Sequence, residues 1–204
     1  MIVDLFSTPI YMVNVLDTGE GKSLSEAIDE VDLDSAVEPN KDSWDCKVET
    51  GFFNTFKLSK KVKEATEKCV FYHAMLFAEG RKIPDLNSLD MSLDGIWLNR
   101  YFQGYSQEPH DHVGLCQISF NYVHRTTTPD NSFKFINTGR NGTDTLWGLS
   151  KQFSFCNSQV KLDLRNGDLV LFPSFLVHSV FHRNKNDRIT LSGNIIVERN
   201  NEAR

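Results

Sequence analysis

Three histidines in this sequence have the residue type and spacing of a metal site. His110 and His112 flank Asp111 in the stretch PHDHVGLCQISF, and His178 lies far downstream in GDLVLFPSFLVHSVFHR. Because side chains of an extended chain alternate between two faces, His110 and His112 point the same way and Asp111 points the opposite way. The long interval before His178 leaves room for several strands that return it to the pair. Imidazole binds Fe, Zn, Cu and Ni alike, so the ligand type does not select the ion.

The other histidines fit the same ion less well. His182 shares a face with His178 but lies roughly 13 Å further along the same predicted strand. His124 stands in a similar relation to His112, and His73 falls within a predicted helix, where a lone histidine is typically structural. We therefore expect a metal site of three histidines.

The last predicted strand carries a row of polar side chains. In RITLSGNI, the polar residues Arg188, Thr190, Ser192 and Asn194 alternate with residues that are largely apolar, so one face of the strand is polar. In a small barrel with a metal inside, that face would line the pocket. An arginine there would bind an anionic cosubstrate, ideally by a two-pronged contact with a carboxylate.

The elements that position these residues change in character along the chain. The pattern predicts a strand at 9–15, a helix at 23–32 with Ser23 as its cap, a loop at 32–49, and an amphipathic helix at 56–80. From residue 94, turn residues separate short apolar segments. Strands are predicted near 94–103, 115–124, 132–136, 152–156, 159–164, 168–172, 177–182 and 188–197.

About eight short strands after a helical section indicate a mainly β fold with flanking helices, of the α+β class. The specific prediction is a double-stranded β-helix, a jelly-roll or cupin-like barrel with helices packed outside. The 204 residues suit one domain. Within it, residues 1–93 would supply the N-terminal strand and supporting helices, and residues 94–200 the barrel.

The composition excludes several classes of function. The net charge of -5 disfavours a broad nucleic-acid surface. No apolar run approaches the roughly 20 residues that cross a bilayer, and the N-terminus lacks the cationic and apolar pattern of a secretory signal. Four scattered cysteines without a CxxC pair are typical of reduced thiols. The expected location is the cytoplasm.

The histidine set and Arg188 resemble the Fe(II)- and 2-oxoglutarate-dependent oxygenases. That family has a double-stranded β-helix, an HxD/E pair and a distal histidine as metal ligands. An arginine or lysine about ten residues beyond the distal histidine binds the far carboxylate of 2-oxoglutarate. Here Arg188 lies ten residues beyond His178, and Arg188-Ile189-Thr190 is similar to the family's RxS/T pattern.

The segment before the histidine pair adds to this resemblance. Asn99 and Tyr101 are similar to the NxY strand of AlkB-type members, whose Asn and Tyr contact 2-oxoglutarate, and Tyr101 precedes His110 by nine residues. A closer match is an uncharacterised branch with an LFPTP-like opening, an HxH pair, a tyrosine-containing strand and an LFPSxxxH segment. The corresponding parts here are LFSTP (5–9), His110-Asp111-His112, Asn121-Tyr122-Val123 and LFPSFLVH (171–178).

The resemblance implies Fe(II) and 2-oxoglutarate as cofactors. The implied metal ligands are His110, His112 and His178, and the implied 2-oxoglutarate contacts are Arg188, Asn99, Tyr101, Tyr122 and Thr190. The implied reaction hydroxylates a protein side chain or a small molecule and releases succinate and CO2. The loops at 32–55 and 125–150 would shape the substrate pocket. The expected partner is a small-molecule, protein or peptide substrate, a homodimer is compatible with the sequence, and neither nucleic acid nor membrane is expected.

Position 112 departs from the family, because most members have Asp or Glu there. One alternative arrangement binds the metal through Asp111 and only one of its neighbouring histidines. Another uses His112-Val113-Gly114 as the HxG motif of related halogenases. Two other functions also stay open: a three-histidine, cupin-like dioxygenase that does not use 2-oxoglutarate, and a non-catalytic metal-binding jelly-roll module.

Overall fold

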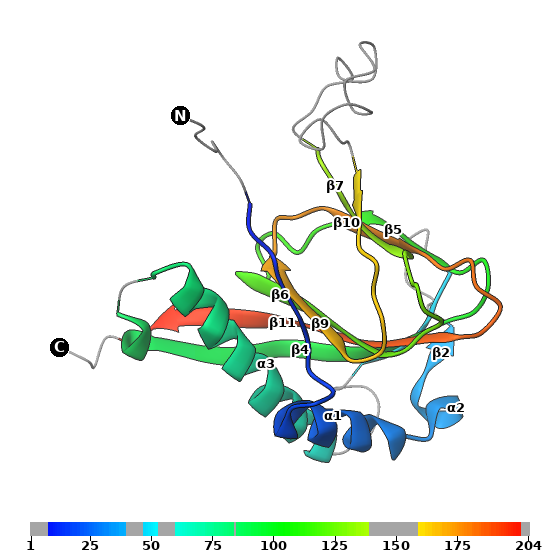
Figure 1. Cartoon of the computed structure of the whole chain (residues 1–204), viewed down its shortest axis with the longest axis horizontal. Helices are drawn as coiled ribbons and strands as arrows, with labels where there is room; N and C mark the ends of the chain where they lie inside the picture. The colour runs from blue at the N-terminus through cyan, green and yellow to red at the C-terminus, as the bar shows by residue number, and fades with distance from the viewer. Residues whose placement is uncertain (1–7, 40–46, 53–59, 84, 139–158, 201–204) are drawn as a thin grey trace, which may run out of the picture.

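Two antiparallel β-sheets face each other in the computed structural model, which describes residues 8–39, 47–52, 60–83, 85–138 and 159–200 (Figure 1). The larger sheet has seven strands, in the order β1 (Tyr11–Asn14), β9 (Asp168–Pro173), β6 (Ile118–Arg125), β11 (Arg188–Arg199), β4 (Leu89–Tyr101), β3 (Glu49–Phe52) and β2 (Glu38–Pro39). The smaller sheet has four strands, in the order β5 (Ser106–His110), β10 (His178–Phe181), β7 (Phe133–Ile136) and β8 (Gln159–Lys161).

Helices cover the outer face of the larger sheet. Helix α1 (Gly19–Asp29) packs beside α3 (Lys60–Gly80), and the short helix α2 (Leu33–Ala36) follows α1 (Figure 1). A 3-10 turn, η1 (Leu86–Ser88), leads into β4. Among the described residues, no helix is both long and apolar enough to cross a membrane.

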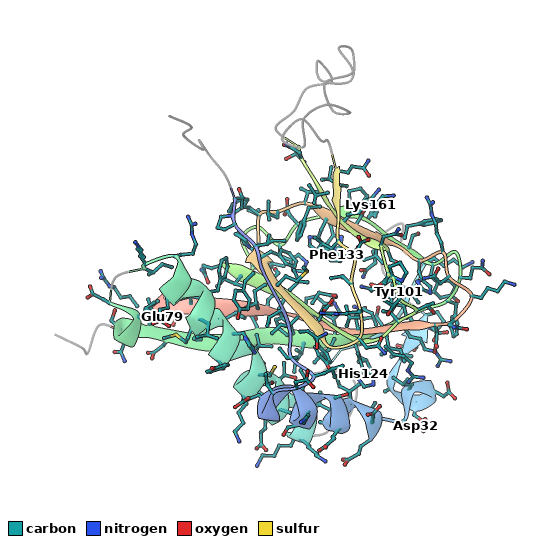
Figure 2. All side chains as sticks on the ribbon, viewed as in Figure 1. Asp32, Glu79, Tyr101, His124, Phe133 and Lys161 are labelled. Atoms are coloured by element: carbon teal, nitrogen blue, oxygen red, sulfur yellow. The ribbon has the colours of Figure 1, made fainter. Side chains whose placement is uncertain are left out.

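The alternation of side chains along β11 separates two cores. Ile189, Leu191 and Ile195 are completely buried in the core between the larger sheet and the helices. Arg188 and Thr190, which alternate with them, are also completely buried and belong to the opposite face. That face lines the space between the two sheets, where a second apolar core includes Phe133, Phe135 and Phe172. Figure 2 labels Phe133 in this space.

The predicted mainly β fold with flanking helices is confirmed, and several boundaries differ. Helix α1 begins at Gly19 and is capped by Thr18, whose hydroxyl accepts the Gly21 N–H at 3.0 Å, so the prediction of Ser23 as the cap was wrong. The predicted loop 32–49 contains α2 and β2. Strand β5 was not predicted, and the strand predicted at 152–156 lies outside the described residues.

Candidate metal centre

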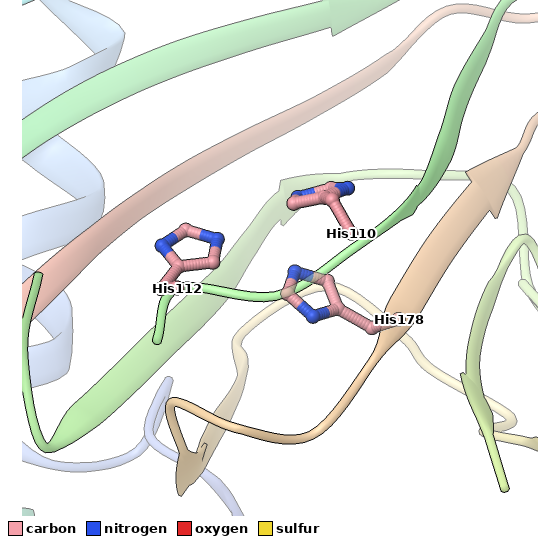
Figure 3. Close-up of side chains that lie close together, drawn as sticks. All are labelled: His110, His112 and His178. Atoms are coloured by element: carbon pink, nitrogen blue, oxygen red, sulfur yellow. The ribbon is translucent and has the colours of Figure 1, made fainter. Parts of the chain in front are cut away.

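The three predicted metal ligands converge at one end of the barrel (Figure 3). One candidate ligand atom from each of His110, His112 and His178 lies within 4.8 Å of the other two. His110 ends β5 and His178 begins β10, and the two residues are directly paired across these strands. His112 follows in the connecting segment, where its backbone N–H donates to the Ser174 carbonyl at 2.9 Å. That bond ties the segment to the loop that leads into β10.

Hydrogen bonds set the same tautomer in all three imidazoles. Nδ1 of His110 lies 2.8 Å from the Glu108 carbonyl oxygen, and Nδ1 of His178 lies 2.9 Å from the Leu176 carbonyl oxygen. Nδ1 of His112 lies 2.8 Å from Oδ1 of Asn194. Because an oxygen of this kind only accepts, each Nδ1 must donate its proton. The unprotonated nitrogen of each neutral ring is then Nε2, which is the form that binds a metal.

Burial keeps these imidazoles neutral. It lowers the pKa of His110, His112 and His178, and the neighbouring His110 lowers the pKa of His178 further, to about 3. A buried imidazole loses the hydration that would stabilise its charged form, so each ring is deprotonated near neutral pH. Neutral rings are ready to bind a cation without first releasing a proton.

Asp111 does not join this cluster. Its side chain is exposed, and its Oδ1 accepts the backbone N–H of Val113 at 3.1 Å, as in an Asx turn. The arrangement in which Asp111 replaces a histidine therefore has no geometric support. The alternative in which His112-Val113-Gly114 is an HxG motif makes His112 the first ligand. It leaves out His110, which the structure brings into the cluster.

Aromatic rings enclose the histidines. Trp97 is stacked on His112 with ring centroids 5.8 Å apart, and Phe172 packs edge-on against His178 with centroids 4.9 Å apart. Phe133 is stacked on the same histidine at 5.5 Å. These rings limit the access of water and restrict the rotation of the imidazoles.

Further along the inner face of β11 from Ser192, which lines the histidine pocket, the barrel interior is polar and buried. Arg188 is completely buried, and its Nε donates to Oδ2 of Asp130 at 2.6 Å. Within the described part of the chain, both terminal nitrogens of Arg188 and the hydroxyl of Thr190 have no hydrogen-bond partner. A buried donor without a partner is costly, so an unpaired set of this kind is typical of a binding site for an anion.

The other residues predicted to contact 2-oxoglutarate lie on two different faces of the larger sheet. Tyr101 is paired with Arg188 across β4 and β11, with its ring centroid 5.3 Å from the guanidinium carbon, and its hydroxyl donates to Gln107 at 2.6 Å. Asn99 is paired with Thr190 in the same way. These residues lie together on the inner face.

Tyr122 does not lie on this inner face, and its predicted contact with 2-oxoglutarate was wrong. It is paired with Leu191 and belongs to the core against the helices, where burial raises the pKa of its hydroxyl to about 12. Directly opposed residues share a face of the sheet. Its neighbour Asn121, paired with Ser192, lines the pocket instead, with its Nδ2 donating to the Ser192 hydroxyl at 2.8 Å.

Two residues in this region were missed by the sequence analysis. The sequence analysis placed Asn194 only on a polar strand face. In the structure its Oδ1 accepts hydrogen bonds from Nδ1 of His112 at 2.8 Å and from the Ser119 hydroxyl at 3.1 Å. Nothing in the sequence marks Asp130 as a buried residue of this site, because an aspartate in a turn such as TPDN is ordinarily exposed. Much of the predicted substrate loops, residues 40–46, 53–55 and 139–150, lies outside the described residues.

The barrel matches a known family and known structures. The family described as "Putative 2OG-Fe(II) oxygenase" matches residues 95–194, which contain all three histidines and Arg188. No curated protein matches the sequence. An oxidoreductase of the 2OG-Fe(II) oxygenase family from Burkholderia pseudomallei has a similar structure, with a TM-score of 0.64 at 11% identity over 92% of this chain and 84% of that one.

Two other similar structures contain ligands. HygX from Streptomyces hygroscopicus, with nickel, 2-oxoglutarate and hygromycin B bound, gives a TM-score of 0.55 at 12% identity over 92% of this chain and 82% of that one. A prolyl hydroxylase from Trichoplax adhaerens, in complex with a hypoxia inducible factor peptide, gives 0.60 at 11% identity over 96% and 85%. The family match covers residues 95–194, and the similar structures show that this chain has the double-stranded β-helix fold.

Proposed function

We propose that this protein is a 2-oxoglutarate-dependent dioxygenase that binds Fe(II) through His110, His112 and His178. The observation that carries the proposal is that the interior of one barrel contains both a cluster of metal-binding histidines and a buried cation with unpaired donors. Three neutral imidazoles converge in a pocket that Ser192 also lines, and Arg188, whose two terminal nitrogens have no partner among the described residues, lies further along the same face of β11. A metal-chelating 2-oxo acid with a second carboxylate has one group for each site.

The chain's residues have distinct proposed roles toward these cofactors. The three histidines would hold the metal through their Nε2 atoms. Arg188 and Thr190 would donate hydrogen bonds to the far carboxylate of 2-oxoglutarate, and Asn99 and Tyr101 would border it. When bound, Fe(II) and 2-oxoglutarate supply the oxidising chemistry that hydroxylates a substrate and yields succinate and CO2.

The donor set fits an iron site without a carboxylate ligand. Three neutral ligands leave the full charge of a divalent cation on the metal, and this charge attracts the 2-oxo acid end of a dianion. Imidazole is also suited to Fe(II). The three-histidine dioxygenase that does not use 2-oxoglutarate remains the rival, because Arg188 could then hold a carboxylate of the substrate itself.

The substrate is proposed as a protein side chain or a small molecule. The similar structures from Trichoplax adhaerens and Streptomyces hygroscopicus contain a peptide and hygromycin B, respectively, so this fold accommodates both kinds. The net charge of -5 favours neither, but it disfavours a nucleic acid.

Turnover of 2-oxoglutarate tests the proposal. The protein is loaded with Fe(II) and supplied with oxygen, ascorbate and 2-oxoglutarate, with and without a screened set of peptides and small molecules. We expect succinate to form only when Fe(II) is present and His178 is intact. If no succinate forms and the loaded protein also fails to bind 2-oxoglutarate, the proposal is wrong and the rival dioxygenase is favoured.

A further inference from the structure

A buried ion pair stands beside the proposed carboxylate site. Arg188 and Asp130 are both completely inaccessible to solvent, and Nε of the arginine lies 2.6 Å from Oδ2 of the aspartate. The pair joins the start of β11 to the segment before β7, residues that are far apart in the sequence. A charge in such a place is tolerated only when a partner neutralises it.

The structure around Asp130 holds its carboxylate in place. Its backbone exchanges two hydrogen bonds with Leu164, at 3.0 and 2.7 Å, and its Oδ1 accepts the backbone N–H of Ser132 at 3.0 Å. Burial raises the pKa of this carboxyl, but Arg188 and the hydrogen bonds from Ser132 outweigh burial and bring the pKa below its usual value. Asp130 is therefore a fixed negative charge.

Asp130 occupies only one edge of the guanidinium. Its contact uses Nε, while both terminal nitrogens of Arg188 have no partner in the described part of the chain. The guanidinium is planar and has donors on more than one edge, so a second carboxylate can be bound in addition to the first. A ligand carboxylate at those nitrogens would share one cation with Asp130.

The charges of the pocket can be compared with and without its proposed ligands. Without ligands, the three neutral histidines and the Arg188–Asp130 pair together carry no net charge. With a divalent metal and a dianionic 2-oxo acid added, the sum is again zero. Without Asp130, the empty pocket would contain an uncompensated buried cation.

We propose, on the basis of the proposed function, that Asp130 is an internal counter-ion that neutralises the buried charge of Arg188 and keeps its guanidinium oriented while the cosubstrate is absent. It also competes with the far carboxylate of 2-oxoglutarate, because two negative charges then share one guanidinium. Asp130 is thus a positioning residue that limits the affinity for 2-oxoglutarate and stabilises the empty barrel. A purely structural role would not affect these two properties in opposite directions.

The test is the variant Asp130→Asn, which retains an oxygen to accept from Nε but loses the charge. Binding of 2-oxoglutarate to the Fe(II)-loaded protein is measured anaerobically by calorimetry, and thermal unfolding is measured without ligands. We expect about tenfold tighter binding of 2-oxoglutarate together with a lower unfolding temperature. Binding of 2-oxopentanoate, which has a methyl group in place of the far carboxylate, should not change.

A matched control separates this effect from general destabilisation. Asp168 is also buried, but its carboxylate bonds Asn14 and Arg165 instead of Arg188. The variant Asp168→Asn should lower the unfolding temperature and leave the affinity for 2-oxoglutarate unchanged.

The outcomes distinguish this inference from the proposed function. If the unaltered protein binds no 2-oxoglutarate, the proposed function fails first. If it does bind, and Asp130→Asn binds 2-oxoglutarate equally or more weakly, the counter-ion inference is overturned. If Asp130→Asn is unfolded alone but folds with Fe(II) and 2-oxoglutarate, the ligand carboxylate has replaced the counter-ion and the inference is supported. If it stays unfolded with both ligands, the inference is also overturned.

Discussion

Replacing Asn194 with alanine should weaken metal binding, because Asn194 orients His112 without touching the metal itself. Its buried Oδ1 accepts from Nδ1 of His112 at 2.8 Å and from the Ser119 hydroxyl at 3.1 Å. Removing the amide leaves the imidazole N–H without its acceptor. The imidazole can then rotate, and the tautomer with the proton on Nε2 is no longer disfavoured.

The magnitude follows from the number of donors that lose a partner. The Ser119 hydroxyl can turn toward the Cys116 sulfur, 3.6 Å away, so only the His112 N–H remains unsatisfied. One unsatisfied buried donor costs about 1–3 kcal/mol of folding stability. Loss of a group that orients a metal-binding histidine lowers metal affinity by about 10–100-fold.

The assay is an anaerobic calorimetric titration with Fe(II), accompanied by urea unfolding of the metal-free protein. Asn121→Ala is a suitable control, because both amides are 4% exposed and Asn121 bonds Ser192 instead of a histidine. The control should lose stability and keep its metal affinity. Equal losses of metal affinity in Asn194→Ala and Asn121→Ala would refute the orienting role.

Three further substitutions test the buried ion pair, the packing of the larger sheet and the cap of helix α1. Arg188→Ala leaves Asp130 buried and unpaired, so we expect a loss of about 3–5 kcal/mol in urea unfolding, with weaker 2-oxoglutarate binding and unchanged metal affinity; a loss below about 1 kcal/mol would contradict the buried pair. Gly193→Ala places a Cβ 2.6 Å from a ring carbon of Phe120 and should cost about 1–3 kcal/mol in the same assay, whereas an unchanged stability would mean that the sheet has room. Thr18→Ala removes the cap of α1 and should cost about 1 kcal/mol by thermal unfolding, with Thr18→Ser retaining most of the stability; equal losses in both variants would argue against the cap.

Spacing and alternation in the sequence predicted which candidate residues lie together in the barrel. Arg188 and Thr190 alternate with apolar residues, and this period is sufficient to place both on one face of a strand. Alternation within β6 does not decide which face of the sheet Tyr122 occupies without the register of the neighbouring strand. Its partner is Leu191, but the register between two strands is a property of the folded sheet and is not visible in either segment alone.

Other features depend on contacts between distant segments. Strand β5 contains Pro109 and lacks regular alternation, which is compatible with an edge strand and gives little signal in the sequence. The early start of α1 requires Gly21, because a Cβ there would lie 1.9 Å from the Val15 carbonyl oxygen. Glycine has low helix propensity, so the first turn of this helix was missed. Asp130 acquires its role only through contact with Arg188.

The central claim is tested most directly by an anaerobic titration of the Fe(II)-loaded protein with 2-oxoglutarate. The structure predicts one metal ion and one 2-oxoglutarate per chain, with binding of the 2-oxo acid lost when His178→Ala removes a ligand and weakened when Arg188→Ala removes the cation. Two results would contradict the proposed pocket. One is that the loaded protein does not bind 2-oxoglutarate, and the other is that both variants bind it as tightly as the unaltered protein does.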